Sequence, residues 1–124
     1  MNSSGVKRLL KSFGYAMAGI RNALVERNMR IHLLAAVLVF AAGFLLDIDR
    51  QEWCLVVLCI GAVISAEMFN TAIERLCDHV CNCAYDKTIG IVKDIAAGAV
   101  LIAALVAAIV GLVIFIPRLL NLIL

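Results

Sequence analysis

The chain consists of one amphipathic segment followed by three long apolar runs. Across residues 5–25, apolar side chains recur every three or four positions, and most of the basic side chains lie off that stripe. This spacing predicts a helix that lies on a membrane surface, either as an anchor alone or also as a cover over a site at the interface. The runs at about residues 31–48, 53–76 and 94–116 are each long enough for one helical crossing of a bilayer. The pattern therefore predicts a single domain over residues 1–124, an all-α integral membrane protein with three transmembrane helices and a surface helix.

Composition supports a membrane protein and excludes an ordinary soluble globule. Of the 124 residues, 65% are hydrophobic and only 16% are charged. Leucine, isoleucine, valine and alanine supply most of this hydrophobicity, as in helices that face lipid. We expect a lipid partner and no nucleic-acid partner.

Lysine and arginine are distributed unevenly around the three runs, and such residues favour cytoplasmic loops. Only Arg50 and Arg118 would lie on the opposite side of the membrane. We therefore expect the N-terminus and the loop between the second and third runs to be cytoplasmic, and the turn at residues 47–52 and the C-terminus to be external. The basic residues on the expected cytoplasmic side are Lys7, Arg8, Lys11, Arg21, Arg27, Arg30, Arg75, Lys87 and Lys93.

Polar residues at the end of the second run share one helix face. Glu67, Asn70, Glu74 and Asp78 are three, four and four positions apart, so on a helix they fall within an arc of roughly 80°. Glu74 and Asp78 could be ordinary interfacial carboxylates paired with Arg75 or Lys93. Glu67 lies deeper, among apolar residues, where a carboxylate is kept mainly when it faces a cavity, a partner or an ion. We expect a functional role for Glu67.

Further charged residues flank the same side of the predicted membrane. Glu26 precedes the first run, and Lys93 and Asp94 open the third. Several carboxylates with a lysine and an asparagine can hold a divalent cation and a polyphosphate. The glycines are scattered, so no glycine-rich phosphate loop is predicted.

Three of the five cysteines, Cys77, Cys81 and Cys83, cluster around an aspartate and a histidine. Their spacing lacks the paired Cys-x2-Cys pattern of common zinc sites. The predicted topology also places them in a reducing compartment. We expect small reduced side chains in a loop rather than a metal centre.

Two segments carry a resemblance to a known family. Residues 67–74 read Glu-Met-Phe-Asn-Thr-Ala-Ile-Glu, with Asp78 one turn later, and residues 93–100 read Lys-Asp-Ile-Ala-Ala-Gly-Ala-Val. Together with residues 26–32, Glu-Arg-Asn-Met-Arg-Ile-His, they resemble the bacterial membrane diacylglycerol kinase and undecaprenol kinase family. The resemblance extends over nearly the whole chain.

The resemblance implies a homotrimer in the bacterial cytoplasmic membrane that transfers the terminal phosphate of ATP to a lipid alcohol, at sites shared between subunits on the cytoplasmic face. In the family pattern, Glu67 resembles the general base, and Glu26 and Glu74 resemble ligands of Mg2+. Asn70, Lys93 and Asp94 resemble contacts to the ATP phosphates. The remaining matches are Asp78 and Tyr15 near the nucleoside and Arg8 near the lipid.

The resemblance does not decide the lipid. Residues 30–32 and 96–99 are more similar to the undecaprenol kinase branch, which makes undecaprenol the expected substrate and diacylglycerol the alternative. The loop at residues 81–87 departs from the family pattern, so Asp86 and Lys87 are left out of the predicted site. Two other classes of function are considered: a proton-coupled transporter that uses Glu67, and a non-catalytic assembly subunit packed through small residues of the third run. Neither explains Lys93 beside the carboxylates.

Overall fold

The computed structural model describes residues 3–124, and this part of the chain is entirely helical outside short connections. The prediction of an all-α fold is confirmed. Four helices follow in order: α1 (Ser3–Ala23), α2 (Arg27–Leu45), α3 (Arg50–Val80) and α4 (Lys87–Ile123).

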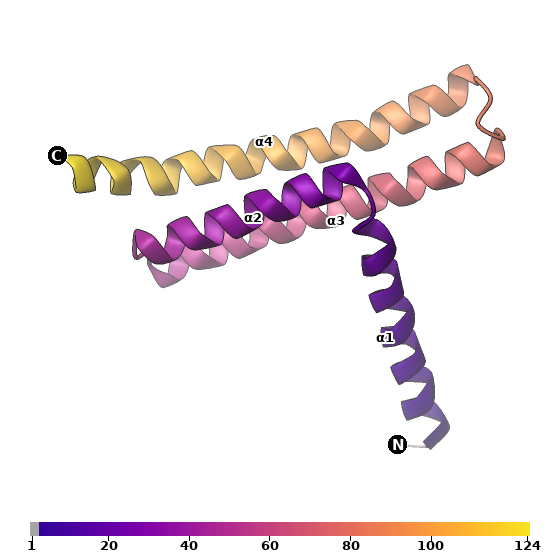
Figure 1. Cartoon of the computed structure of the whole chain (residues 1–124), viewed down its shortest axis with the longest axis horizontal. Helices are drawn as coiled ribbons and strands as arrows, with labels where there is room; N and C mark the ends of the chain where they lie inside the picture. Colours follow the sequence, from indigo (N-terminus) through magenta and orange to yellow (C-terminus); the bar gives the residue numbers. More distant parts are fainter. Residues whose placement is uncertain (1–2) are drawn as a thin grey trace.

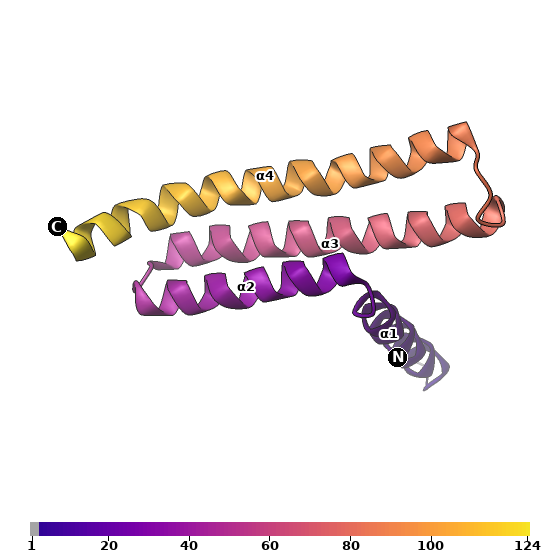
Figure 2. The same ribbon diagram turned by 45° about the horizontal axis from the view of Figure 1, so that its top comes forward.

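The three long helices form an open bundle with α3 at its centre. α3 packs along α4 and also against α2, whereas α2 and α4 contact each other little. α1 leaves the bundle at a steep angle and contacts it only near its own C-terminal end, as Figures 1 and 2 show. The α2–α3 turn and the C-terminus share one end of the bundle, here called the turn end. The α3–α4 connection lies at the opposite end, here called the loop end.

The helices of this bundle present most of their large apolar side chains outward. α2, α3 and α4 are each long and apolar enough to cross a membrane. Leu38, Leu105 and Ile109 are all more than half exposed in the single chain. Because apolar side chains gain nothing from facing water, these surfaces are suited to lipid or to other protein chains. The chain is a multi-pass membrane protein.

The first span ends earlier than the apolar pattern predicts. α2 ends at Leu45, and Asp47 adopts a left-handed backbone conformation with φ of 50°. Ile48, the last residue of the predicted span, is not helical and instead packs with Val56 and Ile114 in a small core. Ile48 is therefore apolar because it is buried beneath the α2–α3 turn, and it does not extend the first transmembrane helix.

The last helix is longer at both ends than its apolar run. α4 begins at Lys87, where the Asp86 carboxylate accepts a hydrogen bond from the Ile89 backbone N–H at 3.0 Å. It also continues through Pro117, because a proline removes one helical hydrogen bond without preventing further turns. At 1.5 Å per residue, its 37 residues span roughly 55 Å, against a hydrocarbon core of about 30 Å. A turn or more of α4 must therefore extend beyond the hydrocarbon core or be accommodated by tilt.

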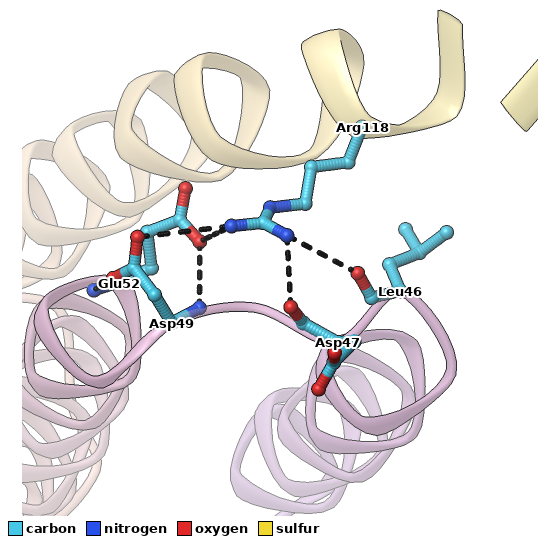
Figure 3. A network of polar contacts seen from close by, with 5 residues as sticks. All are labelled: Leu46, Asp47, Asp49, Glu52 and Arg118. Carbon is cyan, nitrogen blue, oxygen red and sulfur yellow. Dashed lines mark hydrogen bonds and ion pairs between the residues drawn. The ribbon is translucent and has the colours of Figure 1, made fainter. Parts of the chain in front are cut away.

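Arg118 joins all three long segments at the turn end (Figure 3). Its guanidinium lies 2.6 Å from the Glu52 carboxylate and 3.7 Å from that of Asp49. It also donates to the backbone carbonyls of Asp47 at 2.8 Å and Leu46 at 3.4 Å. Because the planar guanidinium carries several fixed donors, one arginine holds α4 against the α2–α3 turn.

The same end has a reciprocal helix cap and close aromatic packing. Asp49 accepts from the Glu52 backbone N–H, and the Glu52 carboxylate accepts from the Asp49 N–H, both at 2.9 Å. Trp53 packs against Phe44 with ring centroids 4.8 Å apart. Gly43 lies under Trp53 so closely that a Cβ atom would come within 2.7 Å of the indole. The turn end is thus tightly packed and capped.

Candidate active site at the loop end

The predicted polar stripe lies on the face of α3 that is enclosed by its neighbours. Glu67 and Asn70 are only 3% and 4% exposed, and Thr71 beside them is also buried. Further along α3, Glu74 and Asp78 become partly exposed. Burial of a carboxylate and an amide in a bundle that leaves most apolar side chains exposed is unusual, because buried polar groups need partners. The most deeply buried polar groups of the described chain therefore coincide with the residues predicted to carry chemistry.

His32 of α2 faces the buried carboxylate. Its Nε2 atom lies 3.7 Å from Glu67 Oε2, which is an ion-pair distance but longer than a hydrogen bond. The His32 side chain is about a quarter exposed, whereas that of Glu67 is almost completely enclosed. The two residues come from different helices, so α2 and α3 together define the surroundings of the carboxylate.

Asn70 is one turn beyond Glu67 on α3. Its side chain makes a polar contact with the Glu67 carboxylate. Its amide oxygen is buried and has no hydrogen-bond partner within residues 3–124. Leaving a buried acceptor unpaired costs about 1–3 kcal/mol, so the site carries an acceptor suited to a donor from a bound molecule.

An apolar groove of about 530 Å³ runs between α2 and α4 along the same face of α3. Small side chains of α4, including Ala104, Ala107 and Gly111, leave the space, and Ile60 and Val63 of α3 form its floor. Ile60, Val63 and Glu67 are spaced three and four positions apart and therefore lie on the same face of α3. His32 also lines the groove, so the groove and the buried carboxylate share one wall residue.

Glu26 occupies the position just before α2, but its side chain does not cap that helix. Instead its carboxylate accepts from the Arg75 guanidinium at 2.9 Å. Arg75 also donates to the Asn22 carbonyl at 3.0 Å and so joins α3 to the end of α1. Of the two basic partners that the sequence offers to Glu74 and Asp78, Arg75 pairs with Glu26 instead, and Lys93 pairs with Asp78.

Asp78 and Lys93 are brought together from α3 and α4. The Lys93 ammonium donates to the Asp78 carboxylate at 2.8 Å, which is one of the pairings that a purely interfacial role also predicts. Both residues line a polar hollow of about 340 Å³ at the loop end, together with Tyr85 and Asp86. An ammonium group has three donors, so Lys93 keeps donors for a second anionic partner.

Other predicted residues are not brought into contact with this group. Glu74 and Asp94 take part in none of the ion pairs found within residues 3–124. Arg8 and Tyr15 lie on α1 and are both exposed, Tyr15 to 75%. The α1 helix as a whole projects away from the bundle (Figure 1). Within one chain they do not complete the site.

The carboxylates near Glu67 do not form a metal-binding cage by themselves. No cluster of three histidine, cysteine or acidic side chains with metal-binding geometry occurs within residues 3–124. Mg2+ commonly uses only one or two carboxylates and takes its other oxygens from water and phosphates. The oxygen donors of Glu26 and Glu74 both act electrostatically on Glu67 and fit this chemistry. A complete protein cage is not required.

Three residues near the site were given no role in it from the sequence. His32 lay within the family-like segment at residues 26–32, and nothing in its local sequence indicates Glu67 as its neighbour. Thr71 lay within the motif at residues 67–74, and it is buried. Arg75 was counted as a cytoplasmic charge or as a partner of carboxylates on its own helix, whereas it joins Glu26 to α3.

Comparisons with known proteins identify the family of the chain. The family described as prokaryotic diacylglycerol kinase matches residues 14–115. An undecaprenol kinase from Bacillus subtilis (strain 168) is 40% identical over 115 residues, which cover 92% of this chain and 93% of the relative. A diacylglycerol kinase from Synechocystis sp. (strain ATCC 27184 / PCC 6803 / Kazusa) is 41% identical, covering 92% and 66%.

A diacylglycerol kinase from Escherichia coli (strain K12) is 33% identical over 109 residues, which cover 87% of this chain and 88% of the relative. No solved structure matches the chain. All three relatives are named as kinases, which argues against the transporter hypothesis. The family match spans most of the chain and includes α2, α3 and the greater part of α4. The chain therefore belongs to the prokaryotic diacylglycerol kinase family.

Proposed function

We propose that this membrane protein transfers the γ-phosphate of ATP to the hydroxyl of a lipid alcohol, with undecaprenol as its substrate. The observation that carries the proposal is the position of Glu67, a buried carboxylate where an apolar groove meets a polar stripe. A lipid alcohol has the same division, with an apolar chain and one reactive hydroxyl. The groove matches the first part and Glu67 the second.

In the proposed reaction the lipid hydroxyl oxygen attacks the γ-phosphorus of ATP. The bond between that phosphorus and the bridging oxygen of ADP breaks, and ADP leaves with the bond's electron pair. Glu67 takes the hydroxyl proton, so the products are a lipid phosphate and ADP. Phosphoryl transfer depends mainly on positioning and on neutralising the charge of the phosphates, which a fixed base and nearby cations supply.

The loop end supplies the groups expected to hold the nucleotide. Lys93 can contact phosphate oxygens while Asp78 accepts one of its hydrogen bonds. Asn70 and Asp94 are the other residues proposed to lie near the phosphates. The polar hollow beside Asp78 would accept the nucleoside end.

Magnesium is proposed as the metal that accompanies ATP. Glu26 and Glu74 would hold it, since carboxylate oxygens are the ligands it prefers. When bound, the ion would neutralise part of the charge on the phosphates. Arg75 pairs with the Glu26 carboxylate at 2.9 Å and so orients it toward α3.

Undecaprenol is proposed because the Bacillus subtilis undecaprenol kinase matches almost the full length of both chains. The groove is proposed to hold part of its prenyl chain, because the lining is apolar apart from His32 and runs along the membrane-crossing parts of the helices. Diacylglycerol is the second candidate, and the relatives of that name from Synechocystis and Escherichia coli favour it.

We further propose a homotrimer in the bacterial cytoplasmic membrane, with the N-terminus and the loop end in the cytoplasm. The exposure of Arg8 and Tyr15 on α1, a helix that projects from the bundle, supports a shared site. In an assembly these residues could reach the site of a neighbouring subunit. The exposed apolar faces of the three long helices would supply the packing surface.

The test is phosphate transfer by purified protein in lipid vesicles, using radiolabelled ATP and Mg2+ with undecaprenol and diacylglycerol offered side by side. Glu67→Gln is the matched inactive variant, because it keeps the size of the side chain but removes the base. Preferential labelling of undecaprenol, lost in the variant, is the expected result. Labelling of diacylglycerol instead would reverse the substrate, and no labelling of either lipid would overturn the proposed activity for these substrates.

A further inference from the structure

His32 faces two features at once, although nothing in the proposed reaction yet uses it. Its Nε2 atom points to Glu67 Oε2 at 3.7 Å, and its ring lines the apolar groove. It is the one nitrogen-bearing side chain among the groove-lining residues. The imidazole therefore borders both the groove and the buried carboxylate.

The charges around Glu67 explain why a partner on α2 matters. Glu74 on α3 and Glu26 before α2 both repel a negative charge at Glu67. Asn70 and a protonated His32 act in the opposite direction. Lys93 of α4 pairs with Asp78. Within residues 3–124, His32 is therefore the one group with a possible positive charge that acts on Glu67 from a neighbouring helix.

We propose that His32 is a positioning residue for Glu67. The Nε2–H group holds Oε2, which leaves Oε1 directed to the lipid hydroxyl at the end of the groove. A donor at Nε2 is enough for this role, so the imidazole need not carry a charge before the reaction. The 3.7 Å separation shortens to a hydrogen bond when the site is loaded, as polar contacts in empty active sites commonly do.

A packing role alone does not account for this placement. The His32 side chain is about a quarter exposed and borders open space, so an apolar residue could fill the same wall position without an unpaired donor. Glu67 otherwise lacks a partner from outside α3 among the hydrogen bonds and ion pairs of residues 3–124. Without His32, the carboxylate could rotate away from the groove, and the rate would fall although ATP still binds.

The inference rests on the proposed kinase activity and is tested in the same vesicle assay with the intact protein. The variants are His32→Ala, His32→Leu and His32→Gln, with Val39→Ala as the control for a change in the same groove wall seven residues away on α2. Added imidazole is the probe for the missing ring, because the groove beside His32 is open. Turnover and the KM for ATP are measured for each protein, with and without imidazole.

We expect His32→Ala and His32→Leu to lower turnover on the order of tenfold to a hundredfold, as loss of a base-orienting group does, with the KM for ATP within about twofold. His32→Gln keeps an N–H donor at similar reach and should retain more activity than His32→Leu. Imidazole should restore turnover of His32→Ala and have no effect on Val39→Ala.

Equal turnover in His32→Leu and the wild type would overturn the positioning role. So would equal losses in His32→Gln and His32→Leu without imidazole rescue, since that result indicates packing alone. The wild type and Glu67→Gln separate this failure from failure of the kinase proposal. If Glu67→Gln remains active, the base is wrong, whatever His32 does.

Discussion

The two ends of the helical bundle use polar residues in opposite ways. At the turn end, Arg118 is matched by two carboxylates and two backbone carbonyls, and Glu52 completes a helix cap as well. At the loop end, Glu67 has one ion-pair partner within residues 3–124, at 3.7 Å, and the buried amide oxygen of Asn70 has no hydrogen-bond partner there. The polar groups around Arg118 find their partners within the chain, whereas the buried polar groups around Glu67 do not all find partners in the described chain.

This difference distinguishes a structural cluster from a functional one. Buried polar groups that are fully paired hold elements together, whereas groups left short of partners destabilise the fold and are retained for binding or chemistry. Proximity of charges alone would not separate the two ends. The comparison predicts that changes at the loop end affect catalysis and that changes at the turn end affect stability.

Apart from the proposed base Glu67, the largest expected effect concerns Lys93. Lys93→Met removes the donors proposed for the ATP phosphates and should raise the KM for ATP by about tenfold or more, since charge-assisted hydrogen bonds are stronger than neutral ones. Its ion pair with Asp78 is partly exposed, so the stability should change little. Steady-state kinetics and thermal unfolding measure the two quantities. Lys87→Met at the exposed start of α4 is the control, and an unchanged KM with lost stability would assign Lys93 a structural role.

The next effect should appear only in stability. Arg118→Met leaves Glu52 and two carbonyls without their shared donor and should lower the free energy of unfolding by about 2 kcal/mol. Turnover per folded molecule should stay within about twofold, because the site is at the other end of the bundle. The matched control is Arg50→Met, an exposed arginine of the same end. Denaturation in detergent micelles checks both variants, and a loss of turnover with unchanged stability would remove the distinction between the ends.

The smallest effect concerns packing beneath Trp53. A methyl group at Gly43 would meet the indole at 2.7 Å, so Gly43→Ala should destabilise the turn end by about 1–2 kcal/mol through overpacking. Gly61→Ala on α3 is the matched control, because nothing lies within 4 Å of its added methyl group. That control should be neutral or slightly stabilising, since alanine favours a helix over glycine by about 1 kcal/mol. Equal melting temperatures in both variants would show that the contact with Trp53 is readily relieved.

Much of the fold was accessible from the sequence because membrane helices carry a strong local signal. The surface helix and the three apolar helices follow from spacing and from run length, and the stripe from Glu67 to Asp78 follows from helical periodicity. The limits of the elements were less accurate. Ile48 is apolar because it is buried in a turn, and Pro117 does not end α4.

The pairings were not predictable because they join residues far apart in the chain. Arg75 contacts Glu26 across 49 positions, and Arg118 contacts Glu52 across 66. Local spacing cannot state which carboxylate an arginine meets after folding. The same limit hid His32, whose relation to Glu67 depends on how α2 packs on α3.

The most direct test measures turnover per folded molecule and the unfolding midpoint for Glu67→Gln and Arg118→Met in one lipid preparation with undecaprenol as acceptor. We expect Glu67→Gln to unfold like the wild type and to lose turnover by about a hundredfold or more. Arg118→Met should show the opposite pattern, with near-normal turnover and a lower midpoint. Near-normal phosphate transfer by folded Glu67→Gln would contradict the assignment of the chemistry to the buried carboxylate at the loop end.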